Sequence, residues 1–513
     1  MQQFGEYLSE YLGEYLGEYL GEYLTLASGA FLLLAVGLAL SFEFVNGFHD
    51  TANAVATVIY THSLKPVPAV IWSGLWNLAG VLTSTGTVAF SVVALLPAEL
   101  VLNVGSGAGF AMVFALLISA MGWNLGTWYL GLPASSSHTL IGSIMGVGVA
   151  HSLLSSGAEF GEGVNWAKTQ EVFVSLLTSP LIGFVGAALL LLLTKTLLPQ
   201  PALYEAPEGE ASPPIWIRGL LILTCTGVSF AHGSNDGQKG MGLIMLILVG
   251  ILPGLYALNL NLAPAAIEQL TAASEAMVAL EAANIQLSPA QTLSVEQSEC
   301  ELSQFLKTTG EVTENTLAAI SLKQKEIVTT LTQTTALEAL SLSEKIHLRS
   351  DIYLISASLN KLERLHQIPD SINAEIQTYR QNLNTLTQFI PIWVKVAVAV
   401  ALGIGTMVGW KRIVVTVGEK IGKDHLTYAQ GASAELVAMS TIFAADQFGL
   451  PVSTTHVLAS GVAGTMTANG SGIQGNTVRN ILLAWVLTLP ACILLGGITF
   501  TAELLLLRWL NVA

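Results

Sequence analysis

The chain has 513 residues, of which 52% are hydrophobic and only 11% are charged, and its mean hydropathy is +0.61. Soluble globular proteins carry roughly 25% charged residues, and disordered chains are poor in apolar side chains. The composition excludes both classes and, together with the apolar segments described below, predicts an all-α integral membrane protein. A sequence pI near 5.0 supplies no basic stripe to neutralise a nucleic-acid backbone, so no nucleic-acid partner is predicted.

The first 25 residues form a low-complexity tail in which the tetrapeptide GEYL recurs. The tail contains five glutamates and no lysine or arginine, whereas a secretory signal begins with positive charge. Two interpretations stay open: an extension without a specific function, or a helix at the membrane surface with its Tyr and Leu side chains among the headgroups.

Apolar segments long enough to cross a bilayer, which takes about 20 residues, recur along the chain after the tail. Two further apolar segments, 131–150 and 451–468, are rich in Gly, Ser and Thr. They predict broken or re-entrant helices, because irregular backbone at membrane depth is tolerated only where protein or a cavity surrounds it. The predicted spans are 26–45, 67–96 (long for one crossing), 109–129, 172–194, 215–232, 241–258, 391–410, 427–447 and 480–507.

Two polar segments interrupt the spans. Residues 197–214 contain five prolines and are predicted to form a hinge loop between a first transmembrane half, 26–196, and a second half made of 215–258 and 391–513. Residues 259–390 place Leu and Ile at helical spacing among Glu, Gln, Ser and Thr. This pattern predicts a polar, helical extramembrane hairpin inserted into the second half.

The orientation is predicted from a short basic loop. Lys411, Arg412, Lys420 and Lys423 lie one span after the polar insertion, and the positive-inside rule places such a loop in the cytoplasm. The insertion, residues 259–390, is then expected outside the cell.

Two pairs of matching segments predict that the membrane part consists of two homologous halves. FVNGFHDTANA, from Phe44, matches FAHGSNDGQKG, from Phe230, and GLPASSSHTL, from Gly131, matches GLPVSTTHVL, from Gly449. The two segments of each half have the same separation once 259–390 is removed. Duplicated halves with Gly-interrupted apolar segments are typical of secondary transporters whose site lies between the halves.

The first pair of segments carries Asp50 and Asp236 at equivalent positions. An ionisable side chain inside an apolar span costs about 2.5–3.5 kcal/mol. One carboxylate in each half therefore predicts a functional site, with helix capping as the structural alternative. The other polar candidates beside these carboxylates are His49, Asn53, Asn235 and Lys239.

The second pair of segments supplies hydroxyl groups. A proline followed by Ser and Thr is a helix-start signal, and the free N–H groups at a helix start attract anions. Two such starts predict a site for a tetrahedral oxyanion, with hydroxyls that only cap helices as the alternative. The residues are Ser136, Ser137 and His138 in the first half and Thr454, Thr455 and His456 in the second, where the histidines either relay protons or orient the hydroxyls.

Carboxylates beside an anion predict coupled transport. An ionised Asp50 or Asp236 repels an anion at close range in a low-dielectric site, so tight binding requires a protonated carboxyl group or a bound cation. The sequence therefore predicts cation-driven symport, in which each ion raises the affinity for the other. An enzyme is not expected, since a Ser adjacent to a His in sequence usually points away from it, and the absence of a GxxxxGK loop argues against ATP-driven transport.

At these segments the sequence resembles the Pit-type inorganic phosphate transporters, in their bacterial low-affinity symporter branch. The resemblance covers nearly all of the membrane part, and the insertion has a counterpart of similar placement in the bacterial members, whereas the tail is not matched. The matching strings are GFHDTANAVATVIYT at Gly47, WNLGTWYLGLPASSSHTLIG at Trp123, AHGSNDGQKGMG at Ala231, TYAQGASAELVA at Thr427 and GLPVSTTHVL at Gly449.

The resemblance implies a multi-pass protein of the cell membrane with inverted-topology halves, no cofactor, and phosphate held near a two-fold axis. It implies a proton or a sodium ion as the coupling partner and, as in bacterial relatives, a neutral complex of phosphate with a divalent metal as a further cargo; the oligomeric state stays open. The residues that match the family's phosphate site are Asp50, Asn53, Ser136, Ser137, Asp236, Thr454 and Thr455, and those assigned to coupling or auxiliary roles are His49, His138, Asn235, Lys239 and His456.

Two departures from the family pattern bear on the coupling ion. His49 stands where much of the family has Asn, and Lys239 stands where the first segment has Asn53. Lys239 supplies a positive charge that a sodium ion would otherwise contribute, so proton coupling is predicted, with sodium coupling as the alternative. Transport of another oxyanion such as sulfate is the remaining alternative, because sulfate only accepts hydrogen bonds whereas phosphate also donates them.

Overall fold

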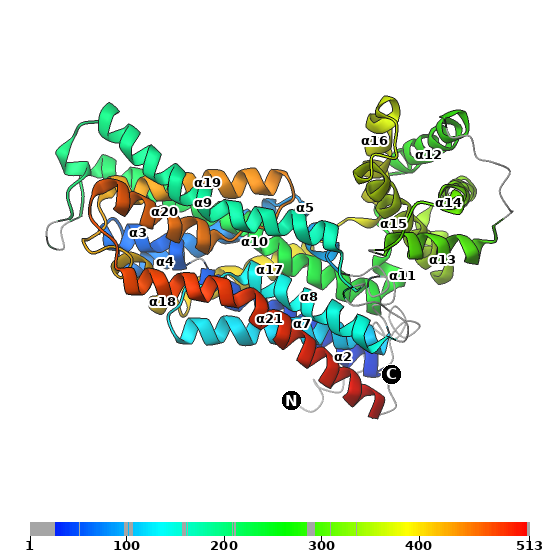
Figure 1. The fold of residues 1–513 in the computed structure, drawn as a ribbon, viewed down its shortest axis with the longest axis horizontal. Coiled ribbons are helices and arrows are strands. Elements are labelled where there is room, and N and C mark those ends of the chain that lie inside the picture. The colour runs from blue at the N-terminus through cyan, green and yellow to red at the C-terminus, as the bar shows by residue number, and fades with distance from the viewer. Residues whose placement is uncertain are drawn as a thin grey trace, which may run out of the picture. The chain divides into compact units, whose positions relative to one another are not determined.

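The computed structural model describes residues 26–50, 52–96, 101, 106–155, 161, 163–207, 209, 212–284, 293–307, 309–334 and 336–509. Within these ranges every regular element is a helix, and the only β-type pairing is an isolated bridge between Gly422 and Ile473 (Figure 1). The predicted all-α fold class is confirmed. The GEYL tail, predicted over residues 1–25, lies outside the described residues.

The described residues form two compact units, and the larger one draws on Gly37–Pro97, Phe110–Ile244 and Ile390–Ala513. Six helical stretches of the described chain are long and apolar enough to cross a membrane, and two bent helix pairs raise the number to as many as eight. The helices of the membrane part are α2 (Leu26–Asp50), α3 (Ala52–Tyr60), α4 (Pro66–Thr83), α5 (Thr87–Val93), α7 (Gly107–Tyr129), α8 (Ser136–Leu154), α9 (Trp166–Leu197), α10 (Ile215–Ile251), α17 (Ile392–Met407), α18 (Lys411–Glu419), α19 (Tyr428–Gln447), α20 (Thr454–Asn469) and α21 (Gly475–Trp509).

The prediction of two separate spans over 215–232 and 241–258 is wrong, because α10 is one continuous helix from Ile215 to Ile251, through the whole of the first predicted span and into the second. The polar residues between them do not interrupt the helix, since their side chains bond to neighbouring helices. Gln238 donates to the Asp446 carboxylate over 2.7 Å, and Asn235 donates to the Leu450 carbonyl over 3.1 Å. The α10 backbone satisfies its own hydrogen bonds, as it must within a membrane.

The long stretch predicted over 67–96 is a bent pair, in which α4 and α5 meet at 78°. Helix α5 starts after Gly86, whose φ of +94° is readily adopted only by glycine. The apolar length of this stretch is therefore divided between two short helices, which form either a broken span or a re-entrant loop.

The two helices that carry the hydroxyl clusters begin in the same way. Gly131 and Gly449 have φ values of +66° and +63°, and each is followed by extended backbone that leads into α8 or α20. The side chains of Ser135 and Ser453 then cap the helices by accepting from the backbone N–H three residues on. This local agreement fits the predicted duplication; inversion of the halves stays a prediction.

Helices from one predicted half pack against helices from the other. Gly47 of α2 lies against the backbone of α17 at Leu402, and the equivalent Gly233 of α10 lies against the backbone of α4 at Asn77. A Cβ atom at either glycine would collide with those backbone atoms. Further contacts join α8 with α21, α9 with α20 and α4 with α17. These close approaches bring the two Asp-containing segments into one buried region.

The second unit contains most of the polar insertion and has its own apolar core, which includes Leu302, Ile327, Ile352 and Leu383. The insertion is helical, as predicted, but it is not a two-helix hairpin, because its described residues form five α-helices and two 3-10 helices of three residues each. Helical spacing identified the helices, but it does not count the turns that let each helix pack on several others. The five helices are α12 (Pro264–Asn284), α13 (Val295–Leu306), α14 (Glu314–Gln333), α15 (Leu342–Arg364) and α16 (Asn373–Thr387).

Candidate functional site

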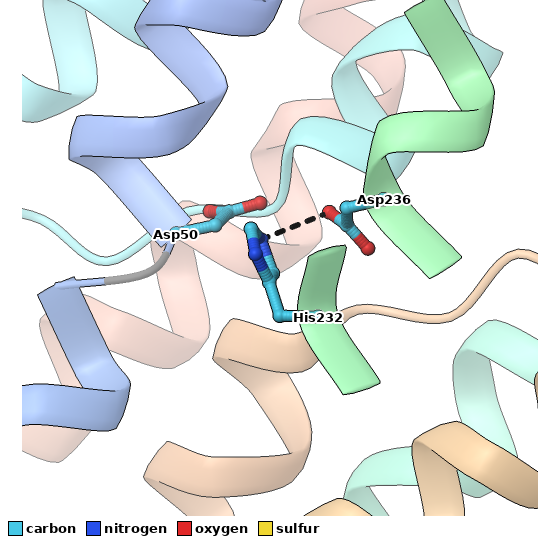
Figure 2. Close-up of side chains that lie close together, drawn as sticks. All are labelled: Asp50, His232 and Asp236. Carbon is cyan, nitrogen blue, oxygen red and sulfur yellow. Dashed lines mark ion pairs between the residues drawn. The ribbon is translucent and has the colours of Figure 1, made fainter. Parts of the chain in front are cut away.

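The two predicted aspartates lie in one buried cluster. Asp50 is the last residue of α2, and Asp236 lies in the middle of α10; their exposed fractions are 1% and 0%. The ring of His232 lies between the two carboxylates (Figure 2), and one ligand atom from each of the three residues lies within 4.8 Å of the others. The structure therefore brings equivalent carboxylates from the two predicted halves to a common site.

Asp50 joins the starts of both hydroxyl-bearing helices. Thr455 of α20 donates to Asp50 Oδ1 over 2.8 Å, and the backbone N–H of Ser136, at the start of α8, donates to Asp50 Oδ2 over 3.4 Å. His49 Nδ1 lies 3.0 Å from Oδ1 of the same carboxylate. One carboxylate thus occupies the position to which two helix starts direct their donors.

Asp236 is paired with a buried cation. Lys239 Nζ lies 2.7 Å from Asp236 Oδ2 and donates to Ser137 Oγ over 2.6 Å, and the lysine has an exposed fraction of 0%. Ser137 in turn donates to the Val452 carbonyl over 2.7 Å. Three of the predicted site residues, from α8 and α10, therefore form one chain of polar contacts.

Two buried hydroxyls are available to a ligand. Ser136 Oγ and Thr454 Oγ1 occupy equivalent positions at the starts of α8 and α20, and neither has a hydrogen-bond partner among the described residues. A buried hydroxyl without a partner costs free energy, so these two groups are expected to be satisfied by something that enters the site. This observation argues against the alternative in which the hydroxyls of Ser136 and Thr454 only cap helices, because the side chains that cap α8 and α20 are those of Ser135 and Ser453.

The two predicted histidines face each other. The rings of His138 and His456 have centroids 4.6 Å apart, and His456 also stacks on Trp485 at 4.0 Å. His138 Nδ1 lies 2.9 Å from Oγ of the capping Ser135. The orienting role therefore has a hydrogen bond behind it for His138, which contacts the capping hydroxyl of its own helix, whereas the His456 ring contacts His138 and Trp485.

The remaining predicted residues have positioning contacts or are not described. The Asn235 side chain bonds to the backbone of Leu450 and Val452, which precede α20. His49 Nε2 lies 3.1 Å from Thr127 Oγ1. Asn53 lies in α3, and its side chain is outside the described part of the chain.

His232 was not singled out by the sequence, although it lies at the centre of the site. Its Nδ1 lies 2.7 Å from Asn77 Oδ1, and its Nε2 lies 3.5 Å from Asp236 Oδ2. The signal that could have found it is the alignment of the two segments, which places His232 opposite Asn46. A polar residue at this position in both halves indicated a position that faces the site.

Glu435 of α19 is a second buried group that the sequence left unassigned. Thr57 and Thr224 both donate to its carboxylate, and its exposed fraction is 0%. The cost of an ionisable residue in an apolar helix should have marked it in the same way as Asp50. It lies inside the string TYAQGASAELVA that carries part of the resemblance.

The site combines donors for an oxyanion with groups that hold positive charge. Helix starts and hydroxyls bind tetrahedral oxyanions, Lys239 supplies an ammonium group, and Asp50, His232 and Asp236 are a set that can ligate a metal ion. All three residues of this set are buried.

Sequence comparisons with known proteins agree with this chemistry. A family model described as "Phosphate transporter family" matches residues 46–496. The chain is similar to "Low-affinity inorganic phosphate transporter PitA" of Escherichia coli (strain K12), with 40% identity over 92% of this chain and 97% of that protein. It is 41% identical to PitB of the same strain over the same shares, and 27% identical to "Probable low-affinity inorganic phosphate transporter" of Bacillus subtilis over 91% and 96%. The solved structure "The sodium-dependent phosphate transporter" matches 92% of this chain and 98% of its own with 16% identity and a TM-score of 0.49.

Proposed function

The chain belongs to the phosphate transporter family, and on that premise we propose that it is a proton-coupled symporter whose transport site is the Asp50–Asp236 cluster. It is a membrane protein that carries inorganic phosphate, and it is not an enzyme.

The observation that carries the phosphate site is the pair of unpartnered hydroxyls, Ser136 Oγ and Thr454 Oγ1. They lie at the starts of two helices that both contact Asp50. A phosphate ion placed there accepts hydrogen bonds from hydroxyl and backbone donors and donates its own proton to a carboxylate. Sulfate has no proton to donate near pH 7, so an ionised Asp50 disfavours it.

Proton coupling is supported by the position of Lys239. Its ammonium group lies 2.7 Å from Asp236 Oδ2, so the Asp236 carboxylate is already paired with a positive charge that belongs to the protein itself. Asp50 contacts His49, a side chain that can take up a proton. A proton taken up together with phosphate offsets the repulsion between the anion and this cluster, which couples the two ions.

A neutral metal–phosphate complex is the second candidate cargo. The ligand atoms of Asp50, His232 and Asp236 lie within 4.8 Å of one another, and carboxylate and imidazole groups suit divalent metals. A metal bound here would compete with Lys239 for the Asp236 carboxylate, so this cargo is expected to be transported less readily than phosphate with a proton.

The test is uptake of labelled phosphate into proteoliposomes of the full chain under an imposed inward proton gradient, an inward sodium gradient, or neither. We expect accumulation with protons alone, unaffected by excess unlabelled sulfate. Accumulation only with sodium would reject proton coupling and keep phosphate transport. Displacement by sulfate would reject the substrate preference, and dependence on an added divalent metal would favour the metal complex.

A further inference from the structure

A pocket of about 650 Å³ lies where α7 ends and α18 begins. The extended segment that leads to α8 contributes Gly131 to its wall, and the chain before α18 contributes Gly409. No residue of the proposed transport site lines it. Its volume falls in the range of about 300–1,000 Å³ that is usual for small-molecule sites.

The pocket is positively charged. Of the described residues that line it, Lys411, Arg412 and Lys420 are cationic, and none carries a carboxylate. All three cationic residues are exposed. An unneutralised group of three charges around a pocket attracts an anion, and the lining supplies both ammonium and guanidinium donors.

Arg412 is held in place without losing its charge. Its guanidinium group lies over the rings of Trp128 and Tyr129, 5.2 Å and 4.9 Å from their centroids, and donates to the Tyr129 carbonyl over 2.7 Å. A guanidinium has five N–H donors, and the structure assigns one of them to Tyr129. A fixed fork of this kind suits the oxygens of a phosphate group.

The apolar part of the pocket suggests which phosphate it binds. Tyr129 and Leu130 are 65% and 69% exposed, and Tyr129 ends α7, a candidate membrane span. Aromatic residues gather at the membrane interface, and basic pockets at that depth bind lipid headgroups. We propose that this pocket binds the phosphodiester headgroup of an anionic phospholipid, with the exposed Leu130 against the lipid's apolar part.

Free inorganic phosphate shares the headgroup chemistry but would not use the exposed Tyr129 and Leu130. Side-chain contacts also connect the pocket to the transport site. The Trp128 ring lies 5.1 Å from that of Phe48, two residues before Asp50, and Thr127 contacts His49. A bound headgroup is therefore expected to hold the end of α7 against the segment that contains Phe48 and His49. Any effect of this contact on transport rests on the proposed function, whereas binding of the lipid does not depend on it.

The experiment uses the purified full-length chain in nanodiscs of phosphatidylcholine, titrated with a fluorescent phosphatidylglycerol. We expect preferential binding of the anionic lipid. Lys411→Gln or Lys420→Gln should weaken it about five-fold, and the double variant about thirty-fold. Arg412→Lys, which keeps the charge and loses the planar fork, should also weaken it.

The matched control is Lys423→Gln, which removes an exposed charge from the same basic segment but does not line the pocket. An equal loss in Lys423→Gln, or no preference for the anionic lipid in the unmodified chain, would overturn the proposal. Displacement of the lipid by inorganic phosphate, but not by chloride at the same ionic strength, would instead assign the pocket to free phosphate. Because this test measures binding only, its result is independent of the coupling ion.

Discussion

Thr455 donates a 2.8 Å hydrogen bond to the carboxylate of Asp50, from which it is separated by 405 positions in the chain. The bond joins the first segment of one predicted half to the second segment of the other. It leaves Asp50 between the starts of α8 and α20, where an anion with a transferable proton would meet a carboxylate, a hydroxyl and backbone donors.

Asp50→Asn keeps the shape of the side chain and its bond to Thr455 but removes the negative charge and the proton site. Asp236→Asn does the same beside Lys239. We expect Asp50→Asn to fold, and Asp236→Asn to be less stable because it leaves the Lys239 ammonium group without its carboxylate. In folded protein, both variants should lose gradient-driven accumulation of phosphate by at least a factor of about ten, equivalent to about 1.4 kcal/mol. Uptake in proteoliposomes measures this, with the exposed Asp424→Asn as control. Full accumulation in both variants would reject the site.

Lys239→Asn gives the second half the residue that the first half has at Asn53. Breaking a buried ion pair costs about 3–5 kcal/mol of stability. The variant also removes the positive charge beside Asp236, so proton-driven uptake should fall sharply. If the ammonium group stands in for a sodium ion, added sodium should restore part of the uptake in this variant alone. Lys168→Gln, which breaks a partly buried pair with Glu171 away from the proposed site, is the control and should change uptake little. Sodium-independent uptake at the original rate would refute the role of Lys239.

Ser136→Ala and Thr454→Ala should weaken phosphate binding without lowering stability, because neither hydroxyl bonds to another described residue. A lost hydrogen bond to a charged ligand is worth about 1.5–3 kcal/mol, which predicts a loss of affinity of about ten- to one-hundred-fold. Ser135→Ala and Ser453→Ala should behave in the opposite way, with about 1 kcal/mol less stability from the lost caps. Equilibrium binding and thermal unfolding together separate the two roles; the same profile in both pairs would contradict them.

Gly233→Ala should destabilise the packing of α10 on α4, since the added Cβ would collide with the backbone of Asn77. Overpacking of this kind costs about 1–3 kcal/mol. Gly219→Ala in the same helix places its Cβ in open space and should leave stability unchanged or raise it by about 0.5–1 kcal/mol. Thermal unfolding in detergent compares the two, and equal midpoints would show that the close approach is not needed.

Asp351 of the insertion is expected to make its helices more stable in acid. Burial raises the pKa of this carboxyl group from 3.8 to about 6, despite the ammonium group of Lys323 at 2.8 Å. Between pH 3.8 and about 6, the Asp351 carboxyl group therefore holds a proton in the folded state that it has released in the unfolded state. Its stabilising contribution is fully present below pH 3.8 and is lost as pH rises through about 6.

Hydrogen exchange of peptides from α14 and α15 in the full chain, corrected for the intrinsic effect of pH on exchange, measures this loss. Asp351→Asn removes the titrating group and should flatten the dependence between these pH values. A dependence of the same size in the variant would assign it to other groups.

Much of the membrane fold and part of the site chemistry were predictable because they depend on local properties. Hydropathy marks apolar helices wherever they pack, and the cost of a buried carboxylate marks Asp50 and Asp236 without reference to neighbours. The proline and hydroxyl pattern likewise predicted two helix starts, which the structure has at Ser136 and Thr454. Each of these inferences needs only residues that are close in the chain.

The sequence alone therefore determined an all-helical membrane protein with a repeated pair of polar segments, and it named most of the residues that meet. Only the tertiary structure decided which contacts which: Thr455 reaches Asp50, Lys239 bridges Asp236 to Ser137, and His232 lies between the carboxylates. It also decided that α10 continues through its polar segment. The reason is physical: a helix fixes the direction of its side chains locally, but the partner of a buried polar group depends on which distant helix packs against it.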